Sequence, residues 1–158
     1  MICSYLSVLE DSLKKKSLVL DKIKAISQMQ SELLKEEKFD VAAYDRFVDD
    51  KDDCIAELEK LDEGFESLYE KIRQELISNK AMYAEQIKRI QELISEITEK
   101  SVSVQAMEAR NRESVTAYFS REKKVLGQGR KSSKAAYGYY QNLNQAVRES
   151  SSYMDMKK

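Results

Sequence analysis

Apolar residues recur at steps of three and four along most of the chain, which is the spacing of one face of an α-helix. Residues 2–37 are predicted to form a first helix, whose apolar stripe contains three weak points at Lys16, Ser27 and Gln30. Further apolar residues widen this stripe, and a wide stripe suits a helix that packs against two partners.

A second helix is predicted to begin at Val41 and to run to about Ile77. Asp40 is a good N-cap, because its carboxylate can accept from the free amides of the next turn. Phe39 and Tyr44 occupy the two positions of a hydrophobic staple. The coiled-coil-like seam expected for this helix consists of Phe47, Cys54, Leu58, Leu61, Phe65, Leu68 and Ile72.

Residues 78–80 offer a weak turn, so the second helix could continue or could end in a hairpin. We favour the hairpin, because three long helices can bury one another's stripes. The β-branched and polar stretch 101–103 suggests a local loosening of the third helix. The apolar positions of that helix are Tyr83, Ile87, Ile90, Ile94, Ile97, Val104, Met107, Val115, Tyr118 and Val125. The expected fold class is all-α: three long antiparallel amphipathic helices in a coiled-coil-like bundle over residues 1–126.

Composition agrees with this fold. The chain has no proline and four glycines, and 35% of its residues are charged. Turns and tight loops depend on proline and glycine, so this chain can hardly build an all-β fold or a many-looped α/β enzyme. The first residues lack the basic start of a signal peptide, and no apolar run approaches the roughly 20 residues of a membrane span. The cytoplasm is therefore the expected location.

A second region, residues 127–158, begins at a glycine-rich joint and differs in charge from the rest. Residues 121–158 contain nine Lys or Arg and three Asp or Glu, whereas residues 1–120 contain eighteen and twenty-five. The candidate partner-binding residues here share one face of a short predicted helix: Tyr137, Tyr140, Leu143 and Val147. We expect a basic, mobile arm that contacts a partner. The alternative is that the tail folds back and completes the chain's own core, and both states can coexist.

Catalytic chemistry is not indicated. The chain has no histidine, which removes Ser-His and Cys-His nucleophilic systems. Cys3 and Cys54 lack zinc-type spacing, and the latter is expected to fill the core. The acidic run at 49–53, which contains Lys51, is interpreted as a solvated helical face. We expect no enzyme activity, catalytic residue, metal, cofactor or small-molecule substrate. The basic stretch near residue 130 could contact phosphates, but the acidic body argues against nucleic acid.

Two residues of the third helix have alternative interpretations. Asn111 lies in phase with the seam, so it either fixes helix register or forms a hydrogen-bonding point for a bound helix. Tyr118 is either an ordinary core aromatic or a partner-binding residue.

Several stretches together resemble the FlgN-type family of flagellar export chaperones. A polar break and a charged helix that becomes Leu-rich are found in SELLKEEKFDVAAYDRFVDDKDDCIAELEKL. An Asn with charged neighbours and spaced apolar residues follows in AMEARNRESVTAYF, and AAYGYY carries a Tyr-Gly pair. The basic GQGRKSSK segment departs from the family pattern.

This resemblance implies a cytoplasmic chaperone of flagellar type III export. Family members bind the C-terminal helices of hook–filament junction proteins, prevent their early assembly and deliver them to the export gate. An amphipathic client segment needs an apolar groove, which helices with wide stripes supply. The alternative from a different class is a structural coiled-coil scaffold, or homo-oligomeric spacer, with no client.

Overall fold

The computed structural model describes residues 2–122, which form three long helices. Helix α1 spans Ile2–Lys35, α2 spans Val41–Ser78 and α3 spans Ala84–Glu122. A short 3-10 turn, η1 (Lys80–Tyr83), joins α2 to α3. The described residues contain no strand, which confirms the all-α prediction.

The second helix begins where the capping signals place it. The Asp40 carboxylate accepts a hydrogen bond of 3.0 Å from the backbone amide of Ala43. The Phe39 and Tyr44 rings meet edge to face with centroids 5.5 Å apart, as a hydrophobic staple requires. These two interactions fix the entry of α2 and confirm its predicted first residue.

The other predicted boundaries can be compared with the observed ends of the helices. The hairpin between α2 and α3 is confirmed, because Asn79 caps α2 through its backbone amide and the carbonyl of Glu75, 3.0 Å apart. The first helix ends at Lys35 rather than at residue 37. The loosening expected at 101–103 is wrong, since α3 is continuous there and Ser101 is fully buried.

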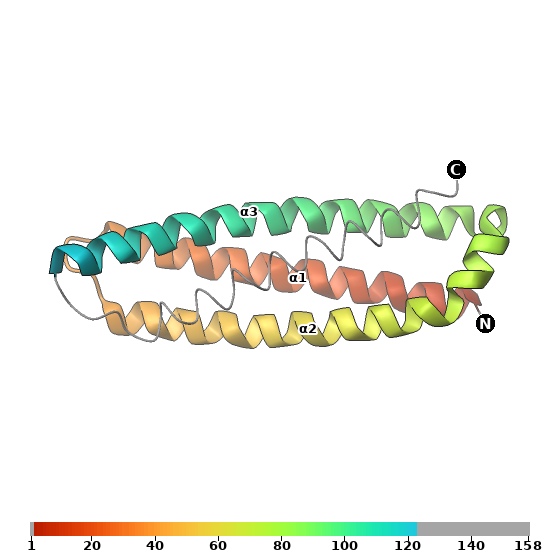
Figure 1. The fold of residues 1–158 in the computed structure, drawn as a ribbon, viewed down its shortest axis with the longest axis horizontal. Coiled ribbons are helices and arrows are strands. Elements are labelled where there is room, and N and C mark those ends of the chain that lie inside the picture. Colours follow the sequence, from red (N-terminus) through yellow and green to blue (C-terminus); the bar gives the residue numbers. More distant parts are fainter. Residues whose placement is uncertain (1, 123–158) are drawn as a thin grey trace.

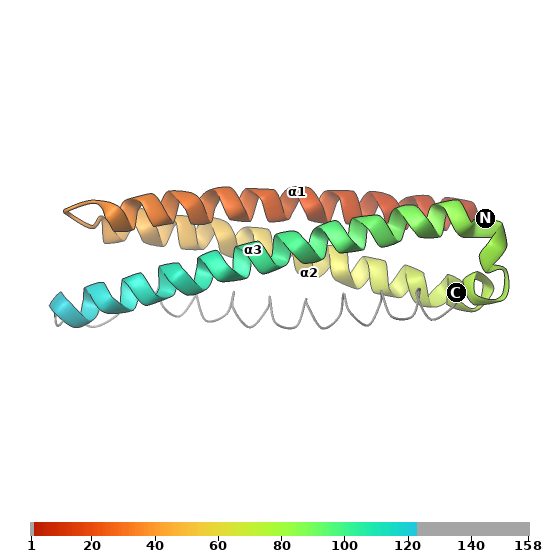
Figure 2. The same cartoon turned by 90° about the horizontal axis from the view of Figure 1, so that it is seen from above.

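The helices run up, down and up again along one long axis, with α1 placed between α2 and α3 (Figure 1). Both α2 and α3 pack extensively on α1, and much less on each other. Seen at 90° to that view, α2 and α3 lie on the same side of α1, and α3 runs obliquely across it (Figure 2). The first helix is therefore the common partner of the other two, as its wide stripe predicted.

Each helix contributes a buried seam whose positions are mostly spaced by three and four. In α3 the seam is regular, with polar residues at three of its positions: Ser101, Glu108 and Asn111. Its apolar positions are Ile87, Ile90, Ile94, Ile97, Val104, Val115 and Phe119, and Tyr83 of η1 continues the same row. A 3.5-residue apolar repeat of this kind is typical of coiled-coil-like packing.

The seam expected for α2 is partly wrong. Leu58 and Ile72 are buried as predicted. The residues Phe47, Cys54, Leu61, Phe65 and Leu68 are only partly buried. The observed buried positions are Tyr44, Val48, Lys51, Ile55, Leu58, Tyr69, Ile72 and Leu76. Most of the predicted residues form a flanking row, spaced by seven, beside this seam.

No helix among residues 2–122 combines the length and apolar character that crossing a membrane needs. The described body ends at Glu122, so the expected division at residue 126 and the tail 127–158 lie outside the described residues.

Candidate functional site: a buried polar layer beside an aromatic end

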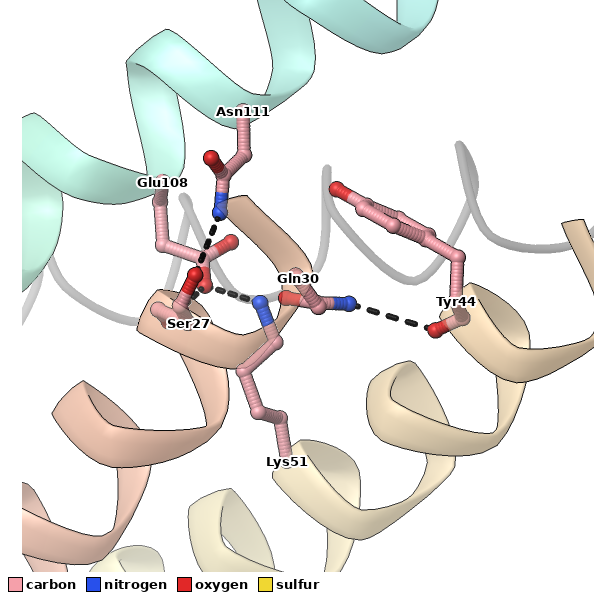
Figure 3. A network of polar contacts seen from close by, with 6 residues as sticks. All are labelled: Ser27, Gln30, Tyr44, Lys51, Glu108 and Asn111. Carbon is pink, nitrogen blue, oxygen red and sulfur yellow. Dashed lines mark hydrogen bonds and ion pairs between the residues drawn. The ribbon is translucent and has the colours of Figure 1, made fainter. Parts of the chain in front are cut away.

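A layer of six polar side chains crosses the interior of the bundle near the α1–α2 connection (Figure 3). Each helix supplies two of them: Ser27 and Gln30 from α1, Tyr44 and Lys51 from α2, Glu108 and Asn111 from α3. None of the six is more than 3% exposed. Because polar groups are costly to bury without partners, the contacts within the layer decide whether it is stable.

The centre of the layer is an ion pair between Lys51 and Glu108, each with a side chain 3% exposed. The same Glu108 oxygen, Oε1, also accepts a hydrogen bond of 2.9 Å from the Ser27 hydroxyl. Burial lowers the pKa of Lys51, and the negative charge of Glu108 opposes this effect. The pair therefore joins all three helices at one point.

Two amide side chains complete the layer. Asn111 Nδ2 donates to the backbone carbonyl of Ser27 at 3.0 Å, and Gln30 Nε2 donates to the carbonyl of Tyr44 at 3.3 Å. The Gln30 oxygen, Oε1, is buried without a hydrogen-bond partner within the described structure. Burial, and secondarily the charge of Glu108, raises the pKa of the Tyr44 phenol, so this group stays neutral.

These contacts bear on the two interpretations of Asn111. Its side chain is 3% exposed and its amide nitrogen is used by the backbone of α1. The geometry agrees with a residue that fixes helix register. A hydrogen bond from this group to a bound helix would require the bundle to open.

On the side of the layer toward the α1–α2 connection lies a small cluster that we call the aromatic end. Its buried members are Phe39, Tyr44, Val48, Val115 and Phe119, and its partly buried members are Leu33, Leu34, Val41 and Tyr118. The ring of Tyr118 meets Phe39 edge to face at 4.8 Å and Phe119 at 5.3 Å. Tyr118 is therefore half inside this cluster and half available at the surface.

The polar layer separates the aromatic end from the main core. The main core includes Ile23, Ile55 and Val104, each of which precedes or follows a residue of the layer by three or four positions along its helix. The aromatic end is consequently a second, smaller apolar core with contributions from all three helices.

A further buried charge lies near the middle of the bundle. Lys16 of α1 is 5% exposed and forms an ion pair with Asp62 of α2. Burial lowers the pKa of Lys16, and the Asp62 carboxylate opposes this effect. The three weak points of the first apolar stripe are therefore buried seam positions. Lys16 is paired with Asp62, and Ser27 and Gln30 belong to the polar layer.

The ion pair is not apparent from the sequence alone. The interpretation of Lys51 as part of a solvated acidic face is wrong, because its side chain is buried. The interpretation holds for Asp49, Asp50 and Asp53, which are exposed. The spacing of apolar residues could have indicated the burial of Lys51, because it lies three residues after Val48 and four before Ile55, on the same face of the helix.

Few of the remaining groups suggest chemistry. Among residues 2–122, no three Cys, Asp or Glu side chains are grouped so that they could hold a metal ion. Cys3 is exposed and Cys54 is half-buried, and both are free thiols. Burial raises the pKa of Cys54, so it is not an activated nucleophile.

The predicted partner residues Tyr137, Tyr140, Leu143 and Val147 lie outside the described residues.

Comparison of the chain with models of protein families, with curated proteins and with solved structures finds no match.

Proposed function

We propose that this chain is a helix-binding protein that serves flagellar export. In this role it holds the C-terminal helices of hook–filament junction proteins in the cytoplasm and delivers them to the export gate. The structural observation that carries the proposal is the aromatic end, and its support from sequence is the resemblance to FlgN-type chaperones. No enzymatic step is part of the proposed role.

The aromatic end has the properties that an amphipathic helix needs for docking. Leu33 and Leu34 from α1, Val41 from α2 and Tyr118 from α3 are all partly buried against one cluster. Partly exposed apolar side chains from several helices can accept the apolar face of a further helix. Tyrosine is also among the residues that most often dominate binding energy.

Calorimetric titration of the full chain with peptides of C-terminal junction-protein helices tests the proposal. We expect Tyr118→Ala to weaken binding by about tenfold or more, which is the usual effect of a hot-spot aromatic. The matched control is Tyr5→Ala, because Tyr5 is also partly buried but packs on the main core. This control should bind like the native chain.

Two outcomes would contradict the proposal. One is that the native chain binds none of the junction-protein peptides. The other is that Tyr118→Ala and Tyr5→Ala weaken binding equally, which would show a general loss of stability rather than a site.

A structural scaffold is the second candidate function. The observation that favours it is the buried polar layer, since polar seam residues specify register and oligomeric state in coiled coils. Analytical sedimentation measures the oligomeric state. A chain that assembles stably with itself and binds none of the junction-protein peptides would favour the scaffold over the chaperone.

A further inference from the structure

Charge is unevenly divided among the three helices. Helix α2 contains twelve acidic and five basic residues, a net charge of −7. Helix α1 contains four acidic and six basic residues, a net charge of +2, and α3 contains seven and six, a net charge of −1. The acidic character of the body is thus almost entirely a property of α2.

The acidic residues of α2 are also concentrated on one arc of the helix, which we call the acidic edge. It consists of Asp45, Asp49, Asp52, Glu59, Glu63, Glu66 and Glu70. Positions spaced by three, four and seven share a helical face, so these seven form a continuous strip.

The acidic edge and an apolar row lie on opposite flanks of the α2 seam. The apolar row, Cys54, Leu61 and Leu68, packs against the main core, and the Cys54 thiol lies close enough to Lys22 of α1 to be influenced by its charge. At the start of the acidic edge, Val48 is three residues from Asp45 and four from Asp52, and it packs with Val115 and Phe119 of α3. The start of the acidic edge is therefore on the side of the seam that turns toward α3.

The chain beyond the described residues has the opposite charge. Residues 123–158 contain eight basic and two acidic residues, a net charge of +6. They follow the end of α3, at the same end of the bundle as the α1–α2 connection and the start of α2 (Figure 1). A segment that returns from this point meets the N-terminal aspartates of α2 first.

We propose that residues 130–158 dock lengthwise on the acidic edge of α2, in the same direction as α2. Helical rise would give these 29 residues a length of about 43 Å, shorter than the roughly 57 Å of α2. This direction places Arg130, Lys131 and Lys134 beside Asp45 and Asp49.

The apolar pattern of the segment fits the same placement. Tyr137, Tyr140, Leu143 and Val147 share one predicted helical face, and this face can turn toward α2 and α3 when the basic residues meet the acidic edge. Of the two states expected from the sequence, charge complementarity favours the one in which the tail covers its own body. The basic residues are steered away from α1, whose net charge is positive.

Distance measurements between two spin labels on the full chain test this docking. The labels replace Ser95 and Ser150 with cysteine, and Cys3→Ser and Cys54→Ser remove the native thiols. The exposed Ser95 lies on α3 and therefore off the acidic edge. We expect one narrow distance distribution, unchanged when labelled chains are diluted with unlabelled ones.

The charge variants have a matched pair on the same helix. Glu59→Lys, Glu63→Lys and Glu66→Lys together reverse the acidic edge, whereas Asp50→Lys, Asp53→Lys and Glu57→Lys reverse three other acids. All six residues are exposed, so both variants should remain folded, as helical circular dichroism would verify. The edge variant should broaden the distribution, and the control variant should not.

Three results would overturn the proposal: a broad distribution in the native chain, equal effects of the two triple variants, or a narrow distance that disappears on dilution with unlabelled chain. The last result would assign the edge to a second copy. Because no client is present, this test is independent of the proposed chaperone function.

Discussion

The substitution Glu108→Leu removes one partner of the buried ion pair and leaves the other inside. The side chain of Lys51 is 3% exposed, so its charge cannot reach water without a change in the bundle. Breaking a buried pair in this way costs about 3–5 kcal/mol. The Ser27 hydroxyl also loses the acceptor at 2.9 Å, so we expect the upper part of this range.

The double variant Lys51→Met/Glu108→Leu provides the contrast. Apolar residues of similar volume avoid the cost of burying charge, and such replacements are often neutral or stabilising by about 1–4 kcal/mol. We therefore expect the double variant to be at least about as stable as the native chain. With the second single variant, Lys51→Met, these chains form a double-mutant cycle, in which the deviation of the free energies of unfolding from additivity measures the coupling of the pair.

Urea denaturation followed by circular dichroism measures these differences, provided that the dependence on urea is the same for all variants. In thermal unfolding the loss in Glu108→Leu corresponds to about 10–20 °C for a chain of this size. The control is Glu32→Leu, since Glu32 and its partner Lys35 are 73% and 71% exposed. An exposed pair contributes less than about 1 kcal/mol.

The pH dependence gives a second readout of the same variant. Burial lowers the pKa of Lys51 below 10.5, and Glu108 opposes this shift. Without Glu108 the folded-state pKa falls further. Between that pKa and the unfolded value the unfolded chain binds more protons, so the free energy of unfolding rises with pH. The deficit of Glu108→Leu should shrink as the pH rises toward 10.5.

The reasoning is refuted if Glu108→Leu is as stable as the native chain at neutral pH. It is also refuted if the double variant is as unstable as Glu108→Leu, because the loss would then come from packing and not from an unpaired charge.

Three further predictions concern α2 and use the same urea assay. Asp40→Ala should cost about 1 kcal/mol, since the cap to the Ala43 amide is lost, and a change below a quarter of this value would contradict the capping role. Gly64→Ala should stabilise by up to about 1 kcal/mol, because a Cβ there meets nothing within 4 Å; destabilisation would show an unrecognised contact. Phe65→Ala should cost less than the roughly 3–5 kcal/mol of an enclosed aromatic, because Phe65 is only partly buried, and a full loss would show that it is enclosed in solution.

The fold was predictable from sequence because its signals are local. The three-four phase and the scarcity of Gly and Pro determine the helices. The signals at Phe39, Asp40 and Tyr44 act within five residues of one another. A short-range pattern of this kind does not depend on how the helices pack.

The polar layer was not predictable in the same way. Lys51 stands among aspartates, and a charge in such a run usually faces water. Its burial depends on Glu108, which is 57 residues away in sequence. The α2 seam was placed on the flanking row for a related reason: two neighbouring apolar rows exist, and only the position of α1 decides which one points inward.

The two buried lysines also determine how the helices can slide along one another. Lys16 and Ser27 are eleven residues apart on α1. On the antiparallel α2, Asp62 lies at the level of Lys16 and Lys51 at the level of Ser27, and these two residues are also eleven apart. Seams with a seven-residue repeat tolerate a slip of one heptad, which keeps apolar residues facing one another. Here such a slip would set Lys16 against Ile55 or Tyr69 instead of Asp62. It would also move Ser27 away from the Lys51–Glu108 pair, whose carboxylate accepts from it. A mismatched alignment therefore buries the charge of Lys16 without its partner, and one alignment of α1 on α2 is selected over its neighbours.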